Sequence, residues 1–425
     1  MKKKKAPLGR RMKEFVKTSV VWGPLDHNLF FTIIFLNVYG IIMVYSASYN
    51  NSITKNYSYF MNNQLKNVIF GFVIMIVASY VNYHRIVRLG WGWFWLLAAV
   101  AIIAALKTPL AHSELGATRW IKLGPVSFQA AEPIKAAIII FFAYYVSYWG
   151  LNRWYNQLLA CLLAIALLGF LFFFSNNLST VIVLFCICAV IILSSVKKPD
   201  LYWYFLLGLA LIIIAAIFVT VYLLMHQGAE NFRFVRIRAW LHPEEYAADE
   251  GLQAMQARYA IGAGGFWGKG LGQSLIKFKL SYSYNDFILA IICEELGVFG
   301  VIVMMTLFGY LLYRIYKIAQ NAWDIEGKVL AIGVFTQIAL QLLINGMVVT
   351  SVIPTTGVTL PFFSAGGTSV VFLLAELGMV LNVDKYAKER RFFEEAERHV
   401  AQMEQRGGIG AAGWRRRLDS ARTRR

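Results

Sequence analysis

The chain has 425 residues, of which 58% are hydrophobic and only 15% charged, and its mean hydropathy is +0.56. This composition excludes a soluble protein of several domains and predicts a polytopic membrane protein. The net charge of +18 does not indicate nucleic-acid binding, because the basic residues concentrate in the two tails and in loops between apolar runs. The cysteines lie inside apolar runs, which argues against disulfides or a zinc site: Cys161, Cys186, Cys188 and Cys293.

Ten mostly apolar runs have about the length that a helix needs to cross a bilayer. In chain order they are Leu29–Tyr45, Leu65–Val81, Leu89–Leu106, Pro133–Tyr148, Leu158–Phe174, Leu178–Val196, Leu201–Leu224, Phe287–Tyr313, Val329–Val349 and Val358–Val383. We therefore expect an all-α polytopic membrane protein with ten transmembrane helices.

The positions of lysine and arginine in short loops predict that both termini lie in the cytoplasm. A basic N-terminal tail would span residues 1–27, the membrane domain residues 28–383, and a charged C-terminal tail residues 384–425. A long extracytoplasmic loop, residues 225–285, would join the seventh and eighth helices. Some basic residues fall on the outer side, where they suit an anionic lipid-linked substrate or belong to a solvated loop: Arg119, Lys122, Arg238 and Lys269.

Ionisable residues within or beside membrane spans are costly, so each is a candidate functional residue. Glu132 and Lys135 lie three residues apart, and they either serve a site or neutralise each other on one helical face. At least one of Glu294 and Glu295 is expected to face the bundle interior or a wet cavity. Glu376 has no partner nearby in the sequence.

Asp286 opens the eighth apolar run at the outer face, directly after a loop rich in glycine and basic residues. A carboxylate there can reach a substrate from water or from lipid. The alternative is a capping box, because Ser283-Tyr-Asn-Asp286 has the spacing of one.

Two glycine-bearing segments predict irregular backbone. The glycines of Gly262–Gly265 and Gly268–Gly272 permit tight turns that bring amide groups, with Lys269, close to an anion, although the segment is no P-loop. The last run is interrupted by Pro361 and by Gly366-Gly367, which suggests non-helical backbone that either is packed in protein or lines a cavity. Polar side chains of the preceding span either face this cavity or join helices: Gln337, Gln341 and Asn345.

Several motifs in this order resemble the SEDS family (shape, elongation, division and sporulation), the group of FtsW, RodA and SpoVE. They are Val44-Tyr-Ser-Ala-Ser48, Arg119-Trp-Ile-Lys-Leu-Gly124 with Phe128-Gln129 and Glu132 to Lys135, Arg238-Ala-Trp-Leu241, the glycine tract Ala260 to Ser274, Asn285-Asp-Phe287, Glu294-Glu-Leu-Gly297 and the block Pro354 to Ser369. The resemblance covers nearly the whole membrane region, and the long tails favour the division type, FtsW.

The resemblance implies a peptidoglycan glycosyltransferase that polymerises lipid II at the outer face of the bacterial cytoplasmic membrane. Its partners would be a class B penicillin-binding transpeptidase and other division or elongation proteins. The family's essential aspartate falls on Asp286, which would act as general base. No metal ligands are predicted, although a divalent cation, Mg or Mn, is a possible cofactor. The candidate substrate-binding residues are Arg119, Lys122, Glu132, Lys135, Arg238, Lys269, Ser364, Thr368 and Ser369.

The chain departs from the family pattern at three places. Ser281-Tyr282 replaces a Pro-Glu pair, Phe128-Gln-Ala-Ala-Glu132 replaces Phe-Gln-Pro-Ser-Glu, and Asn176-Asn-Leu-Ser-Thr180 replaces Pro-Asp-Leu-Gly-Thr. No role is carried over to Tyr282, Ala130, Ala131 or Asn177. Two alternatives remain open: a lipid II flippase, and a non-catalytic division scaffold.

Overall fold

The computed structural model describes residues 21, 23–48, 59–109, 111–114, 117–123, 126–175, 177–196, 232–245, 250–278, 285–405 and 414–415. Its main helices up to the long loop are α2 (His27–Ser48), α3 (Tyr59–Tyr80), α4 (Tyr83–Val87), α5 (Trp93–Ala105), α6 (Ala131–Trp149), α7 (Trp154–Ser175) and α8 (Leu178–Ser195). Those that follow are α10 (Phe232–Leu241), α11 (Glu250–Gly264), α12 (Ile288–Gln320), α13 (Ile325–Val349) and α14 (Gly367–Gln405). Two short 3-10 turns, η1 (Leu89–Gly92) and η2 (Ile276–Phe278), lie between them.

Seven of the described helices are long and apolar enough to cross a membrane, and each overlaps one predicted span: α2, α3, α7, α8, α12, α13 and α14. The protein is therefore a multi-pass membrane protein. Of the other predicted spans, Leu89–Leu106 holds η1 and the 13-residue α5, and Pro133–Tyr148 lies within the 19-residue α6. Leu201–Leu224 lies outside the described residues. The count of ten thus stays a prediction.

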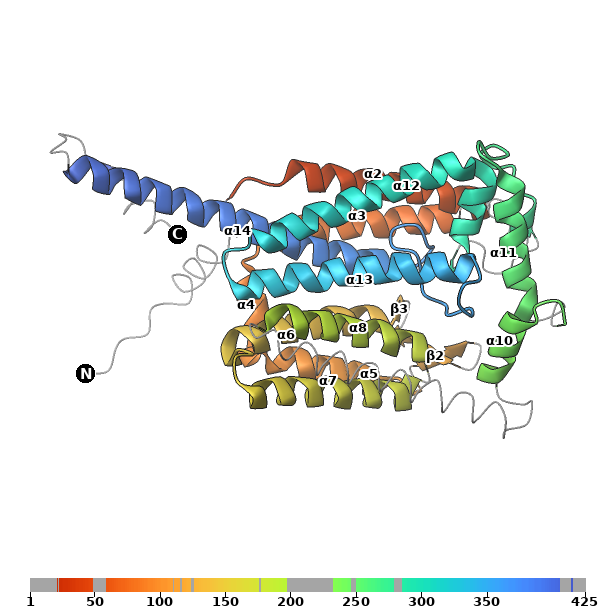
Figure 1. Cartoon of the computed structure of the whole chain (residues 1–425), viewed down its shortest axis with the longest axis horizontal. Helices are drawn as coiled ribbons and strands as arrows, with labels where there is room; N and C mark the ends of the chain where they lie inside the picture. Colours follow the sequence, from red (N-terminus) through yellow and green to blue (C-terminus); the bar gives the residue numbers. More distant parts are fainter. Residues whose placement is uncertain are drawn as a thin grey trace.

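The last predicted span was wrong at its start. Residues 358–366 are not helical, and α14 begins only at Gly367, because Pro361 and the paired glycines interrupt the helix. Phe362 even adopts a positive φ of 67°. At its other end α14 continues without a break through Asp384 to Gln405 and projects beyond the bundle (Figure 1).

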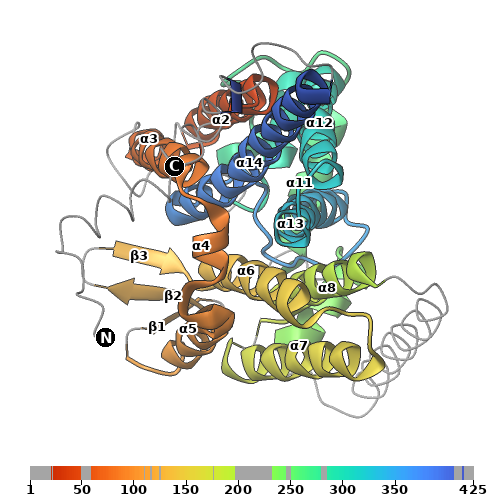
Figure 2. The ribbon, with the colours of Figure 1, turned by 90° about the vertical axis from the view of Figure 1, so that its left-hand side faces the viewer.

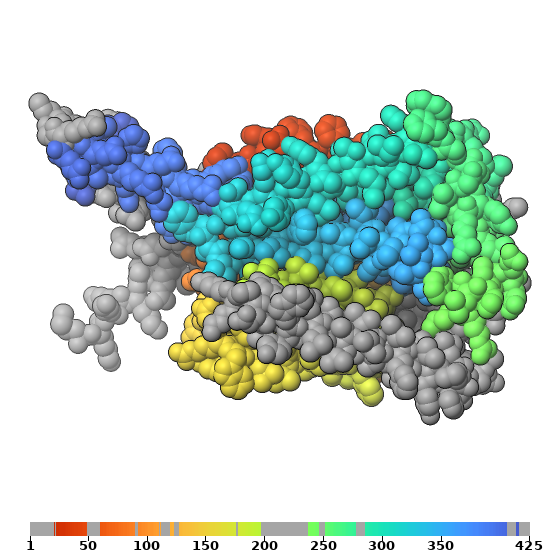
Figure 3. All heavy atoms as spheres, in the orientation of Figure 1, coloured from red at the N-terminus to blue at the C-terminus, as the bar shows by residue number. Residues whose placement is uncertain are grey.

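The long helices lie side by side along one axis of the molecule (Figure 1). Seen along that axis, α5, α6, α7 and α8 form one group, and α2, α3, α12 and α14 lie in another (Figure 2). Helix α13 contacts α6 and α8 of the first group and α12 of the second. At one end α10 and α11 lie across the bundle (Figures 1 and 3). The opposite end holds α4 and the α12–α13 connection, so the predicted outer and inner loops fall at opposite ends.

A small β-sheet corrects the expected all-α class. Strands β1 (Ala111–Glu114), β2 (Ala117–Leu123) and β3 (Val126–Gln129) pair antiparallel in the order β1-β2-β3, with Ile121 opposite Phe128. Threonine, isoleucine and aromatic residues in this segment favour strand. Strand β3 leads directly into α6 and contacts α14, so the sheet fixes the N-terminal end of α6.

Candidate active site

Asp286 lies half-buried in a turn, residues 285–287, immediately before α12. The predicted capping box does not start α12, because the N-cap of this helix is Phe287 and its first helical residue is Ile288. The backbone of the turn is held by two buried side chains from other segments. Asn345 of α13 donates through Nδ2 to the carbonyl of Asp286 at 2.9 Å, and Ser364 Oγ donates to the carbonyl of Asn285 at 2.8 Å.

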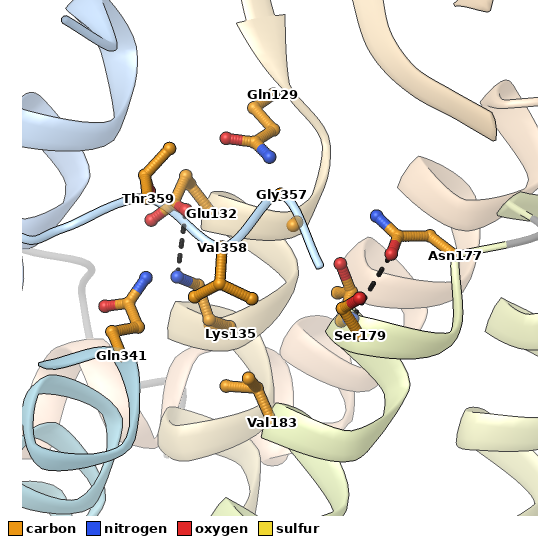
Figure 4. A pocket seen from close by; sticks show the side chains of 12 residues that line it. Gln129, Glu132, Lys135, Asn177, Ser179, Val183, Gln341, Gly357, Val358 and Thr359 are labelled. Carbon is orange, nitrogen blue, oxygen red and sulfur yellow. Dashed lines mark hydrogen bonds and ion pairs between the residues drawn. The ribbon is translucent and has the colours of Figure 1, made fainter. Parts of the chain in front are cut away.

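A small cavity, partly open to solvent, lies between α6, α8, α13 and the non-helical segment before α14 (Figure 4). It is lined by polar and small residues, namely Gln129, Ala131, Glu132, Lys135, Asn177, Ser179, Thr180, Val183, Gln341, Gly357, Val358 and Thr359. The prediction that the interrupted last span borders a cavity is therefore confirmed for residues 357–359.

Asn345 joins this cavity to the Asp286 turn. The same Nδ2 that donates to Asp286 also donates to the carbonyl of Val358 at 2.9 Å, and Val358 lines the cavity. The side chain of Asn345 is fully buried. Because one amide group has two protons, it can hold two carbonyls at once, and here it fixes the backbone of Asp286 to the cavity rim.

Glu132 and Lys135 form a buried ion pair on α6, with Lys135 Nζ 2.9 Å from Glu132 Oε1 (Figure 4). The two expectations for this pair, a role at a site and mutual neutralisation, are therefore compatible. The side chains neutralise each other, and both also line the cavity. A buried ammonium in a polar cavity is suited to an anionic ligand, since it is already desolvated.

The glycine tract has a structural role that the sequence did not reveal. Within α12, Gly297 has non-helical angles, φ 64° and ψ −163°. The N–H groups of Lys269 and Gly270 donate to the carbonyls of Glu294 and Glu295, both at 2.9 Å. In return, the carbonyls of Gly265 and Phe266 accept from α12 at 3.1 Å. The tract thus completes a broken helix, so these amides do not form the expected anion cradle.

Glu294 and Glu295 are both fully buried, in a network of their own, which confirms the prediction that at least one of them faces the bundle interior. Lys269 Nζ lies 2.7 Å from Glu294, whose carboxylate also accepts from Ser274. Lys277 Nζ lies 3.5 Å from Glu295, which accepts from Ser46 as well. The ammonium of Lys269, a predicted substrate ligand, is therefore engaged with Glu294 within the protein.

The other predicted site residues lie on separate elements. Lys122 is exposed on β2, and Arg238 is half-buried on α10. Arg119 also belongs to β2, but its side chain lies outside the description, as do Tyr282 and the rest of residues 279–284. Thr368 and Ser369 begin α14, where Ser369 Oγ donates to the carbonyl of Gly366 at 2.7 Å. Lys122, Arg238, Thr368 and Ser369, the members of this set whose side chains the structure describes, do not line the cavity.

The described residues do not fit a protein-enclosed metal centre. No three His, Cys, Asp or Glu side chains among them gather closely enough to hold a metal ion. Mg²⁺ is usually bound through one or two carboxylates, with water and substrate phosphates completing its shell, so this finding concerns only a site built from protein side chains alone.

Sequence reasoning missed part of the cavity. Asn177, Ser179 and Thr180 at the start of α8 line it, although no role was carried over to Asn177. Asn177 is the N-cap of α8 and accepts from the N–H of Thr180. A polar run at a helix start is the signal that was present, but it is also what ordinary capping produces.

A second polar cluster, also missed, lies at the opposite end of the bundle. His84 Nε2 and the Tyr83 hydroxyl each lie 2.7 Å from Asp324, which caps α13 through the N–H of Gly327. Burial alone would raise the pKa of Asp324, but hydrogen bonds from His84, Gly327 and Tyr83 outweigh it and hold this pKa below its ordinary value. The cluster fastens α4 to α13.

Comparison with known proteins gives the same relatives from sequence and from structure. The family model described as FTSW_RODA_SPOVE, cell cycle protein, matches residues 26–389. A probable peptidoglycan glycosyltransferase FtsW of Trichlorobacter lovleyi is 31% identical over 382 residues, covering 88% of this chain and 96% of that protein. The stage V sporulation protein E of Bacillus subtilis is 33% identical over 370 residues, covering 84% and 96%.

Two solved structures show the same fold. One comes from a study of the structural coordination of polymerization and crosslinking by a peptidoglycan synthase complex; its TM-score is 0.71 at 22% identity, covering 86% of this chain and 99% of that one. The other is the rod shape determining protein RodA of Thermus thermophilus, with a TM-score of 0.61 at 22% identity and coverage of 86% and 98%. The chain belongs to the FtsW/RodA/SpoVE family of cell cycle proteins.

Proposed function

We propose that this protein is a peptidoglycan glycosyltransferase that polymerises lipid II into glycan strands and releases undecaprenyl pyrophosphate. Relatives more than 30% identical over most of the chain carry the name peptidoglycan glycosyltransferase. The geometry adds a half-buried carboxylate, Asp286, fixed beside a polar cavity that contains a buried ammonium.

In this mechanism Asp286 is the general base. It removes the proton from the 4-hydroxyl of the acceptor sugar as that oxygen attacks the anomeric carbon of the donor, and the pyrophosphate leaves with the electron pair of the broken bond. A single displacement inverts the configuration at that carbon. Proton removal contributes about 10²–10⁴-fold to a rate, so positioning and charge neutralisation of the leaving group supply the rest.

One observation carries the proposal: Asn345 donates to the carbonyls of both Asp286 and Val358, each at 2.9 Å. It ties the carboxylate turn to the cavity, so a substrate seated there is held at a fixed position relative to the base. Lys135 is the cavity's candidate ligand for an anionic group, with Glu132 holding its ammonium in place. Arg119, Lys122 and Arg238 are proposed to engage the substrate outside the cavity.

The proposed reaction takes place at the outer face of the cytoplasmic membrane, with residues 1–27 and 384–425 in the cytoplasm and the loop 225–285 outside. The start of α12, which directly follows the Asp286 turn, shares one end of the bundle with β2, β3, α10 and α11, which supports this assignment (Figure 1). A class B penicillin-binding transpeptidase is the proposed partner, since one structural relative belongs to a peptidoglycan synthase complex.

Purified protein with labelled lipid II, assayed with and without a class B transpeptidase and a divalent cation, tests the proposal. Wild type should form glycan polymer, and Asp286→Ala should not. Glu394→Gln, an exposed change on the projecting part of α14, should retain full activity. Translocation of lipid II in liposomes that Asp286→Ala leaves unchanged would instead support a flippase. Wild-type protein that makes no glycan even with its partner would support a scaffold.

A further inference from the structure

Glu376 is a buried carboxyl that the proposed reaction does not use. It lies on α14 with 1% of its surface exposed and accepts from Gln337 Nε2 of α13 at 2.8 Å. Gln337 is equally buried. It lies one helical turn from Gln341, which lines the cavity, so the Glu376–Gln337 pair lies deeper in the bundle than the cavity wall.

Two oxygens of this pair lack partners. Neither Glu376 Oε1 nor Gln337 Oε1 has a hydrogen-bond partner among the described residues. An ionised carboxylate can only accept hydrogen bonds, as can an amide oxygen, so the ionised pair needs two further donors from elsewhere. A protonated carboxyl differs, because its O–H can donate to the amide oxygen while Gln337 Nε2 donates to its other oxygen.

The surrounding charges point the same way. The charged groups that act electrostatically on Glu376 are Lys135 and Glu132 of α6, and Lys135 is already paired with Glu132. Among the other charged groups on the elements packed against α14, Lys66 of α3 and Lys317 of α12 are exposed, His84 binds Asp324, Glu326 of α13 binds Arg88, Arg314 pairs with Asp26, and Glu294 and Glu295 of α12 bind Lys269 and Lys277. With Glu376 ionised, the Glu132–Lys135–Glu376 group would carry one unbalanced negative charge within the membrane domain.

We propose that Glu376 and Gln337 form a proton-binding site, in which a neutral Glu376 is paired with the Gln337 amide through two hydrogen bonds at neutral pH. An isolated buried charge is so costly that such groups neutralise instead. A metal ion is the less suitable ligand, because about six oxygens normally surround a divalent cation and this pair offers two. The inference does not depend on the proposed glycosyltransferase activity.

The neutral pair has a consequence for the cavity. With Glu376 uncharged, Glu132 is the only carboxylate that balances Lys135, and the ammonium stays at the cavity wall. An ionised Glu376, which lies deeper in the bundle, would compete with Glu132 for the ammonium of Lys135. The bound proton therefore keeps the positive charge of the cavity where an anionic group can meet it.

Infrared difference spectroscopy on protein in lipid nanodiscs tests the proposal directly. The spectrum of wild type minus that of Glu376→Gln at about pH 7 should show the carbonyl band of a protonated carboxyl. The control Glu395→Gln, a change in the projecting part of α14, should keep this carboxyl, so the difference between wild type and Glu395→Gln should lack the band. Gln337→Leu should shift that band, because the carbonyl loses its Nε2 donor. A difference spectrum with only carboxylate bands, as expected if water or a cation fills the gap, would overturn the proposal.

Thermal unfolding gives an independent measurement. The folded state holds one more proton than the unfolded state near neutral pH, so wild-type stability should fall as pH rises between about pH 6 and pH 8. Glu376→Gln mimics the neutral acid and should remove that part of the pH dependence. Parallel curves for the two proteins would show that Glu376 is already ionised.

Discussion

The two glycine-bearing irregular segments, residues 265–272 and 354–366, look alike in sequence but use their polar groups in opposite ways. In the first, the N–H groups of Lys269 and Gly270 and the ammonium of Lys269 bind Glu294 and Glu295 of the neighbouring helix. In the second, Gly357, Val358 and Thr359 line the cavity, and the backbone is fixed to the Asp286 turn through Asn345. The polar groups of the first segment are bound within the protein, so this segment supports the site from outside. The second segment borders the cavity and is therefore part of the site.

The largest expected effect concerns Asp286. Asp286→Asn keeps the size of the side chain but removes the base, so polymerisation should fall by about 10²–10⁴-fold. Thermal stability should stay close to wild type. The measurement is the rate of glycan formation from labelled lipid II, alongside a melting curve. An active Asp286→Asn protein would show that the base lies elsewhere and that the 354–366 segment does not adjoin the reacting atoms.

Changes in the first segment should act on stability. Gly268 has φ +79°, and a Cβ there would lie 2.2 Å from the carbonyl oxygen of Glu295. Gly268→Ala should therefore destabilise the protein by more than the about 1–2 kcal/mol of the backbone conformation alone. Gly262→Ala is the matched control, because it lies within α11 with no atom within 4 Å of its Cβ, and helix propensity predicts a gain of about 1 kcal/mol. Melting temperatures in nanodiscs decide between these outcomes.

Asn345→Ala should lower the turnover rate more than its stability cost explains. Loss of two hydrogen bonds to buried carbonyls frees the Asp286 turn, and about 1–3 kcal/mol of lost positioning corresponds to roughly a fivefold to 150-fold slower rate. Asn37→Ala removes another buried asparagine, whose Nδ2 binds only the carbonyl of Ile33 in its own helix. It should leave the rate constant unchanged. Equal rates for the two variants would contradict the positioning role.

Lys269→Met tests whether the ammonium of Lys269 supports Glu294 or binds the substrate. If the ammonium serves Glu294, the variant should melt at lower temperature while its apparent KM for lipid II stays unchanged. The cost should be modest, on the order of 1 kcal/mol, because 32% of the lysine side chain is exposed and Glu294 keeps its bond from Ser274. An increase in KM without a change in melting temperature would return Lys269 to the substrate site.

The smallest effect is expected at the second polar cluster, around Asp324, which lies far from both segments and serves as a baseline. Because the pKa of Asp324 is held below its ordinary value, its interactions stabilise the fold above about pH 4, and this contribution is lost as pH falls through the lowered pKa. Asp324→Asn should melt below wild type at neutral pH, and the gap should narrow under acid conditions. A constant gap would show that the carboxylate charge does not matter.

The sequence was sufficient where a physical requirement repeats along the chain. Long apolar runs identify membrane helices because bilayer thickness fixes their length, and seven of the described helices overlap predicted spans. The placement of Glu132 and Lys135 on one helical face also followed from spacing alone. The interrupted last span was predicted to border a cavity because proline and paired glycines cannot continue a helix.

Contacts between distant segments could not be predicted. The break at Gly297 lies inside an apolar run, and nothing nearby in the sequence reveals that residues 264–270 will supply the missing hydrogen bonds. Lys269 was read as a free cation because its partner is 25 residues away. Asn345 was one of three similar amides, and only the fold shows that it holds Asp286 whereas Gln337 holds Glu376.

The exchange of hydrogen bonds at Gly297 also sets the course of α12. A straight α12 would close its own hydrogen-bond ladder, since glycine tolerates helical angles as well. In the folded chain residues 264–270 take over the carbonyls of Glu294 and Glu295, and the helix is broken at Gly297. The direction in which the N-terminal part of α12 carries Asp286 therefore depends on the segment that precedes this helix.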